Sequence, residues 1–62
     1  MPTVSIVALE GRTVDQKRAL VKDITEAVVK NFKVNPDQVT VVIHEITTEN
    51  IGKEGKLFLD SR

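Results

Sequence analysis

Apolar positions along the chain follow two different periods. Residues 3–9 and 39–46 are largely apolar on both faces of an extended chain, and the second segment is rich in β-branched residues, so both predict buried strands. Between them, apolar residues recur at steps of three and four, which predicts a helix with one apolar stripe. The stripe consists of Leu20, Val21, Ile24, Ala27, Val28 and Phe32, and the solvated side carries Lys17, Lys22, Asp23, Glu26 and Lys30. The pattern therefore predicts strand, helix and strand in that order.

The two ends of the predicted helix carry local signals. Thr13 and Gln16 have the spacing of a capping box, in which each side chain satisfies a free N–H group. Asn35-Pro36-Asp37 closes the connection to the second strand, because Asn is a good cap and Pro suits the first position of a short helical turn. The three elements then form a right-handed β-α-β unit with parallel strands, a fold of the α/β (α+β) class.

Glycines punctuate the segment that follows the second strand. The run Gly52-Lys53-Glu54-Gly55 predicts a hairpin or turn. Residues 56–59 then predict a short strand that pairs with a neighbouring subunit. We therefore expect a short hairpin or strand at the C-terminal end.

The length of the chain predicts self-association. Its 62 residues, 1–62, form one domain, and a domain of this size buries only about 60% of the surface that its unfolded chain exposes. The chain has no Cys and one His, so neither disulfides nor a metal site would compensate. One helix also covers only one face of a parallel sheet, and the other face must meet a second copy. A homo-oligomer follows.

Composition excludes several classes of partner. Nine basic residues balance nine acidic ones, and only two residues are aromatic, which argues against a nucleic-acid surface. No apolar stretch approaches the roughly 20 residues that span a bilayer. The start of the chain also lacks the basic region and apolar core of a signal peptide. We expect a cytoplasmic protein that binds neither nucleic acid nor membrane.

Familiar metal and phosphate motifs fail on inspection. His44-Glu45 begins like H-E-x-x-H, but Thr48 stands where the second His is required. His44 is therefore interpreted as a polar strand or interface residue rather than a catalytic one. The segment from Gly52 to Lys56 is too short for a phosphate loop, and Leu57 replaces the required Ser or Thr. These motifs therefore predict neither a zinc site nor a phosphate loop.

Pro2 directly follows the initiator Met1 and begins the first strand. If Met1 is removed, as is usual before a small residue, the chain begins with a free secondary amine. Model α-amino groups have a pKa near ~7.7 to 8.0, and desolvation or a neighbouring cation lowers it toward the range that suits a general base. The alternative is that Pro2 merely starts an edge strand, where its missing N–H does no harm.

Arg12 lies on a glycine-assisted turn at the far end of the strand that Pro2 begins. About 7 residues of strand at ~3.3 Å each separate the two positions by more than roughly 20 Å. They cannot share a small substrate within one chain. In an oligomer, Arg12 of one copy could approach Pro2 of another and place an anion clamp beside a base. The alternative is an exposed arginine near a helix start.

Several segments together resemble the 4-oxalocrotonate tautomerase family. The resemblance covers essentially the whole chain, at the short length typical of the family. The segments are Met1-Pro2 before an apolar strand, Leu9-Glu10-Gly11-Arg12-Thr13, Asp15-Gln16-Lys17-Arg18, Val41-Val42-Ile43-His44-Glu45, Asn50-Ile51-Gly52 and Gly55-Lys56-Leu57.

The resemblance implies a cofactor-independent isomerase of small enol or dienol carboxylates such as 2-hydroxymuconate, with a role in aromatic degradation. It implies a β-α-β subunit that assembles as a hexamer, a trimer of dimers. Pro2 would act as general base and acid, and Arg12 of a neighbouring subunit would bind a substrate carboxylate and stabilise developing charge. Ile51 occupies the position of a family phenylalanine that walls the site.

Thr40 departs from the family pattern. The resemblance places a second arginine there, and a hydroxyl cannot replace that bidentate partner. His44, Lys53 or Lys56 could supply the missing charge. Two alternatives to a tautomerase stay open: hydration, dehalogenation or decarboxylation of related acids on the same scaffold, or a non-catalytic subunit of a mixed oligomer.

Overall fold

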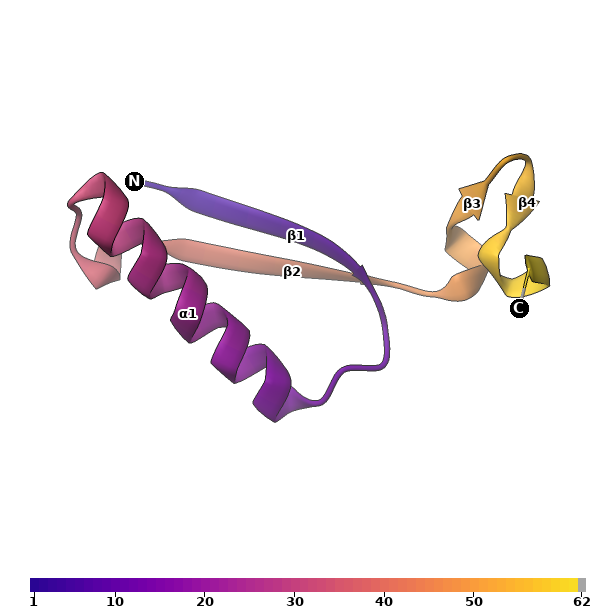
Figure 1. Cartoon of the computed structure of the whole chain (residues 1–62), viewed down its shortest axis with the longest axis horizontal. Helices are drawn as coiled ribbons and strands as arrows, with labels where there is room; N and C mark the ends of the chain where they lie inside the picture. The colour runs from indigo at the N-terminus through magenta and orange to yellow at the C-terminus, as the bar shows by residue number, and fades with distance from the viewer. Residues whose placement is uncertain (62) are drawn as a thin grey trace.

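The computed structural model describes residues 1–61. The chain forms one long helix, two long strands, a small hairpin and three short 3-10 turns (Figure 1). In chain order these are β1 (Thr3–Leu9), α1 (Val14–Phe32), a turn at Pro36–Gln38, β2 (Thr40–Ile46), a turn at Thr48–Asn50, β3 (Gly52–Lys53), β4 (Lys56–Leu57) and a turn at Phe58–Ser61.

Strands β1 and β2 pair in parallel along their full length. The register runs from Thr3 opposite Thr40 to Leu9 opposite Ile46, and the N–H of Glu10 extends it by donating to the carbonyl of Ile46 at 2.9 Å. The predicted β-α-β unit is confirmed. The second strand begins one residue later than predicted, because the N–H of Val39 instead closes the preceding turn by donating to Pro36 at 3.2 Å.

Helix α1 begins where the capping signal predicts. The N–H of Gln16 donates to the Thr13 hydroxyl at 3.1 Å, and the N–H of Thr13 donates to the Gln16 side chain at 2.9 Å. The helix ends at Lys33, which adopts φ of 57° and donates its N–H to the Val29 carbonyl at 3.0 Å. Both ends are thus closed by local hydrogen bonds, so the sequence around them determines the helix length.

The two faces of the sheet differ in what covers them. Helix α1 lies along one face (Figure 1), and the strand residues that are partly buried alternate with exposed ones. The partly buried row includes Val4, Ile6, Ala8, Val41 and Ile43, and the exposed row includes Thr3, Ser5, Val7, Val42 and His44. No residue in 1–60 is fully buried. One helix and two strands therefore leave one face of the sheet, which includes Val7 and Val42, without a covering layer.

The C-terminal hairpin pairs with itself. Gly52 lies opposite Leu57 and Lys53 opposite Lys56 in an antiparallel pair, and Glu54 and Gly55 turn the chain with φ of 55° and 79°. The predicted hairpin is confirmed. The predicted strand over 56–59 is shorter, because residues from Phe58 onward form a 3-10 turn, and within this chain β4 pairs with β3.

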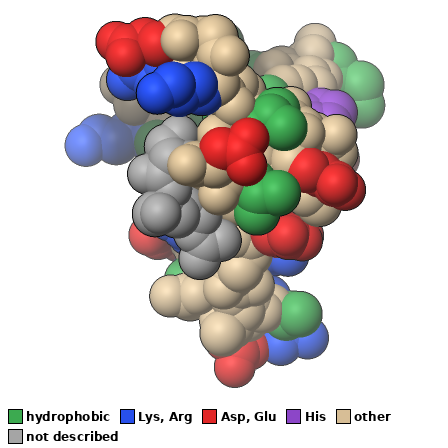
Figure 2. Space-filling model, turned by 90° about the vertical axis from the view of Figure 1, so that its right-hand side faces the viewer, with side chains coloured by type: hydrophobic (Ala, Val, Ile, Leu, Met, Phe, Trp, Pro, Cys, Tyr) green, Lys and Arg blue, Asp and Glu red, His purple; other side chains and the backbone are tan. Residues whose placement is uncertain are grey.

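The hairpin lies beyond the carboxyl end of β2, apart from α1 and from the amino end of β1 (Figure 1). Hydrophobic side chains reach the surface at this end of the molecule, interspersed with acidic ones (Figure 2). Within residues 1–61, no helix is both long enough and apolar enough to cross a membrane.

Candidate active site

Pro2 is anchored at the amino end of the parallel strand pair. Its carbonyl accepts a hydrogen bond from the N–H of Thr40 at 3.0 Å, and its ring is partly buried. Met1 is 93% exposed, so its removal would sacrifice almost no packing. The Pro2 nitrogen thus occupies a defined position at one edge of the sheet.

The two strands themselves bring no permanent cation to this end of the sheet. Neither β1 nor β2 contains Lys or Arg. Thr40, which stands opposite Thr3, contributes an exposed hydroxyl. A cation that acts beside Pro2 must therefore come from another element or another copy of the chain.

Arg12 is located at the opposite end of the sheet. It is exposed, and it follows Gly11, whose φ of 119° suits glycine at the turn out of β1. All seven residues of β1 separate Arg12 from Pro2, and the cavity that Arg12 lines does not include Pro2. The sequence predicts that these two residues lie far apart within one chain, and the structure agrees.

A small cavity lies between the carboxyl ends of the strands and the first turns of α1. Its volume is about 80 Å³, and Arg12, Lys17 and Glu45 are its charged residues. Its apolar wall comes from Ile6, Ala8, Leu9, Leu20 and Ile43.

Lys17 and Glu45 form an ion pair across this cavity, with Lys17 Nζ 2.6 Å from Glu45 Oε1. Lys17 is predicted on the solvated side of the helix, and this prediction is wrong, because the side chain reaches β2. One signal was present in the sequence. Glu45 continues the helix-facing row of Val41 and Ile43, where a carboxylate needs a partner.

Ile51 is partly buried at the base of the hairpin. Its carbonyl accepts a hydrogen bond from the N–H of Phe58 at 2.8 Å. It follows the carboxyl end of β2, whereas Pro2 precedes the amino end of β1. A contact between Ile51 and Pro2 would therefore join two different copies of the chain.

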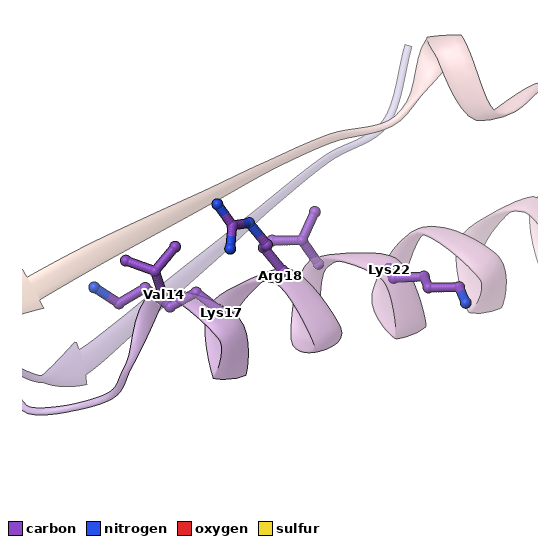
Figure 3. A pocket seen from close by; sticks show the side chains of 5 residues that line it. Val14, Lys17, Arg18 and Lys22 are labelled. Atoms are coloured by element: carbon purple, nitrogen blue, oxygen red, sulfur yellow. The ribbon is translucent and has the colours of Figure 1, made fainter.

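Two further depressions lie on the surface. An open one of about 420 Å³ follows α1 and is lined by Val14, Lys17, Arg18, Val21 and Lys22 (Figure 3). The other, of about 430 Å³, lies on the hairpin and is lined by Lys53, Glu54, Lys56 and Phe58. Neither includes Pro2 or Arg12. Among residues 1–61, no three His, Cys, Asp or Glu side chains gather as a metal-ligand cluster.

Comparison with known proteins identifies the family. The sequence model of the tautomerase family, described as tautomerase enzyme, matches residues 2–61. A probable tautomerase of Halalkalibacterium halodurans is 43% identical over 60 residues, which cover 97% of this chain and 98% of the relative. A 2-hydroxymuconate tautomerase of Bacillus subtilis is 38% identical over 60 residues and 97% of each chain.

Solved structures agree in fold. A chain from a study of the 4-oxalocrotonate tautomerase isozymes of Methylibium petroleiphilum matches with a TM-score of 0.89 at 43% identity, covering 97% of this chain and 94% of that one. A chain of a heterohexamer 4-oxalocrotonate tautomerase from Chloroflexus aurantiacus also gives 0.89, at 27% identity and full coverage of both chains. The resemblance predicted from sequence is confirmed: this chain belongs to the tautomerase family, whose members are isomerases.

Proposed function

We propose that this protein is a cofactor-independent tautomerase of small enol or dienol carboxylates of the 2-hydroxymuconate type. The observation that carries the proposal is the anchored position of Pro2 in a chain of this family. The hydrogen bond between its carbonyl and Thr40 orients the ring. Met1 is exposed, so the fold does not depend on it. After removal of Met1, the Pro2 nitrogen is a secondary amine at a fixed place.

The reaction moves one proton and leaves the atom count unchanged. The neutral Pro2 nitrogen accepts the proton of the enol hydroxyl, the O–H electrons form the carbonyl, and the conjugated double bonds shift. The protonated amine then returns a proton to a distant carbon of the diene. Base and acid are the same group, so the enzyme is restored after each turnover.

In this proposal Arg12 of a neighbouring subunit binds a substrate carboxylate and stabilises the charge that develops during proton transfer. Its distance along the sheet from Pro2 of the same chain supports a site shared between copies. The uncovered sheet face, with Val7 67% exposed, also favours an assembly. We propose a hexamer, and the description of the Chloroflexus aurantiacus relative as a heterohexamer supports an assembly of six subunits.

Ile51 would form part of the apolar wall of the same shared site. An apolar wall disfavours the protonated amine and so keeps the Pro2 nitrogen neutral and able to accept a proton. Thr40, beside Pro2, offers a hydroxyl and no charge. We therefore expect substrates with a single strongly bound carboxylate to be used best.

Product analysis tests the proposal. Protein whose intact mass shows removal of Met1 is incubated with 2-hydroxymuconate, phenylenolpyruvate and a haloacrylate. Formation of the conjugated ketone from an enol is expected, and turnover of the haloacrylate alone would contradict a tautomerase.

The heterohexamer among the relatives raises a second possibility, a non-catalytic subunit of a mixed oligomer. A homogeneous oligomer of this chain that is inert on every enol, and that gains activity only with a second type of chain, would favour this alternative.

A further inference from the structure

The cavity at the carboxyl ends of the strands holds two cations and one carboxylate. Arg12 and Lys17 are the cations, and Glu45 is the carboxylate. The rest of its lining is apolar. One positive charge is therefore in excess, and the pairing of Glu45 decides which cation carries it.

Glu45 forms an ion pair with Lys17. The two side chains are 29% and 36% exposed, and the 2.6 Å separation is that of a charge-assisted hydrogen bond. Lys17 lies just after the first turn of α1, where the positive end of the helix dipole opposes a cation. Glu45, and not the helix dipole, therefore stabilises the Lys17 ammonium group in this position.

In the described part of the chain, Arg12 is left without a partner. Among residues 1–61 its guanidinium forms no hydrogen bond or ion pair. Arginine binds a carboxylate in a planar, bidentate geometry that lysine cannot match. A Glu45 released from Lys17 would therefore compete strongly with any carboxylate ligand for Arg12.

We propose that Lys17 is a positioning residue that occupies Glu45 and so keeps the Arg12 guanidinium available for the substrate carboxylate. The inference rests on the proposed function of Arg12. It adds that an ion pair between two residues of different elements, 28 positions apart, controls the affinity of Arg12 for a carboxylate.

The other ion pair of the described chain lies outside the cavity of Arg12. Arg18 and Asp15 lie 2.7 Å apart, but their side chains are 73% and 89% exposed, and both belong to the first turns of α1. Neither lines the cavity of Arg12. Arg18→Met thus removes a neighbouring cation without releasing a carboxylate into that cavity, which makes it a matched control for Lys17→Met.

The first experiment replaces Lys17 by Met, which keeps most of the apolar stem and removes the charge. The KM for 2-hydroxymuconate should rise about fivefold with kcat nearly unchanged, as expected for a competing ion pair of partly exposed groups. The dissociation constant of cis,cis-muconate, a dienyl dicarboxylate without the enol hydroxyl, should rise by the same factor. Arg18→Met should change neither constant.

The decisive variant is Lys17→Met combined with Glu45→Gln. Without the competing carboxylate, Arg12 is available again, and both constants should return to within about twofold of the parent values. A matched double variant, Lys17→Met with Glu10→Gln, removes an exposed carboxylate outside the cavity and should not recover. If Lys17→Met with Glu45→Gln stays as impaired as Lys17→Met, Lys17 binds the substrate itself or acts only on the fold, and the inference is overturned.

Arg12→Gln separates this inference from the proposed function. If Arg12→Gln binds cis,cis-muconate as the parent does, the proposed role of Arg12 fails. If Arg12→Gln weakens binding but Lys17→Met does not, only the positioning role of Lys17 fails. In ligand-free Lys17→Met, the ¹⁵Nε resonance of Arg12 should also shift and return in the Glu45→Gln double variant, since it reports pairing with Glu45 directly.

Discussion

The amino and carboxyl ends of the parallel strands differ in chemistry. The amino end carries Pro2, held by Thr40, and the strands bring no basic side chain there. The carboxyl end carries Arg12, Lys17 and Glu45 around one small cavity. One end can supply a base and the other an anion site, so a reaction that needs both must unite two copies of the chain.

Blocking the Pro2 nitrogen should cause the largest loss of activity. Protein that retains Met1 has an amide in place of the amine, and its kcat/KM for 2-hydroxymuconate should fall about 10³-fold, within the range lost with a general base. Intact mass establishes the start of the chain and steady-state kinetics measure the loss. Sedimentation should be unchanged, because Met1 is 93% exposed. Full activity with Met1 present would exclude Pro2 as the base.

Removal of the Arg12 charge should have the next largest effect. Arg12→Gln should lower kcat/KM about 10²-fold, the loss typical of one group that stabilises developing charge. Arg12→Lys should recover only part of it, because an ammonium ion cannot bind a carboxylate in a bidentate geometry.

Subunit mixing tests whether the two ends meet between copies. Protein with Met1 retained and Arg12→Gln protein are each nearly inactive, but co-refolded oligomers contain sites with an intact Pro2 beside an intact Arg12. Activity should therefore exceed the sum of the separate proteins. No gain in verified mixed oligomers would place both residues of a site in one chain.

The uncovered face of the sheet links the two ends and should be sensitive to charge. Val7 is 67% exposed on this face, and burial of one Val side chain is worth about 1.5 kcal/mol or more. Val7→Asp should remove this favourable free energy of burial and place a charge in the interface. The oligomer should therefore dissociate at protein concentrations at which the parent stays assembled, as measured by analytical ultracentrifugation. Val14 is 61% exposed at the start of α1, and Val14→Asp serves as the control that should leave assembly intact.

The smallest effect is expected at the Thr13 helix cap, which lies between the carboxyl end of β1 and α1. Thr13→Ala removes the hydroxyl that accepts from Gln16 at 3.1 Å and should lower the free energy of unfolding by about 1 kcal/mol. Urea unfolding measures the change. Gln16→Glu keeps an acceptor for the other half of the capping box and should cost less. A larger loss from Gln16→Glu than from Thr13→Ala would contradict this account of the cap.

Local patterns predicted most of the fold. The β-branched runs, the apolar stripe and the Thr13 capping box depend on neighbours within one turn or one strand. The structure agrees with the strands and the cap, but Leu20 and Phe32 of the predicted stripe are 42% and 67% exposed. The hairpin was predicted from its glycines, but the length of β4 was not. Glu54 and Gly55 turn the chain so that β4 pairs with β3, and a 3-10 turn follows β4 from Phe58 onward.

The candidate site was less accessible to such reasoning. Pro2 and Arg12 stood out because their chemistry is unusual at their positions, whereas Lys17 and Glu45 resemble ordinary surface charges in a linear sequence. Their pairing depends on how α1 crosses the sheet, since the two residues are 28 positions apart. The packing of the helix on the strands therefore had to be known before the ion pair could be found.

By itself, the sequence determined the order of elements, the helix boundaries and the separation of Pro2 from Arg12, because each follows from local hydrogen bonding or from the length of an extended strand. Only the tertiary structure decided which face of the sheet is covered and which cation Glu45 binds. Both depend on contacts between distant segments, where the direction of a side chain follows from the packing of whole elements.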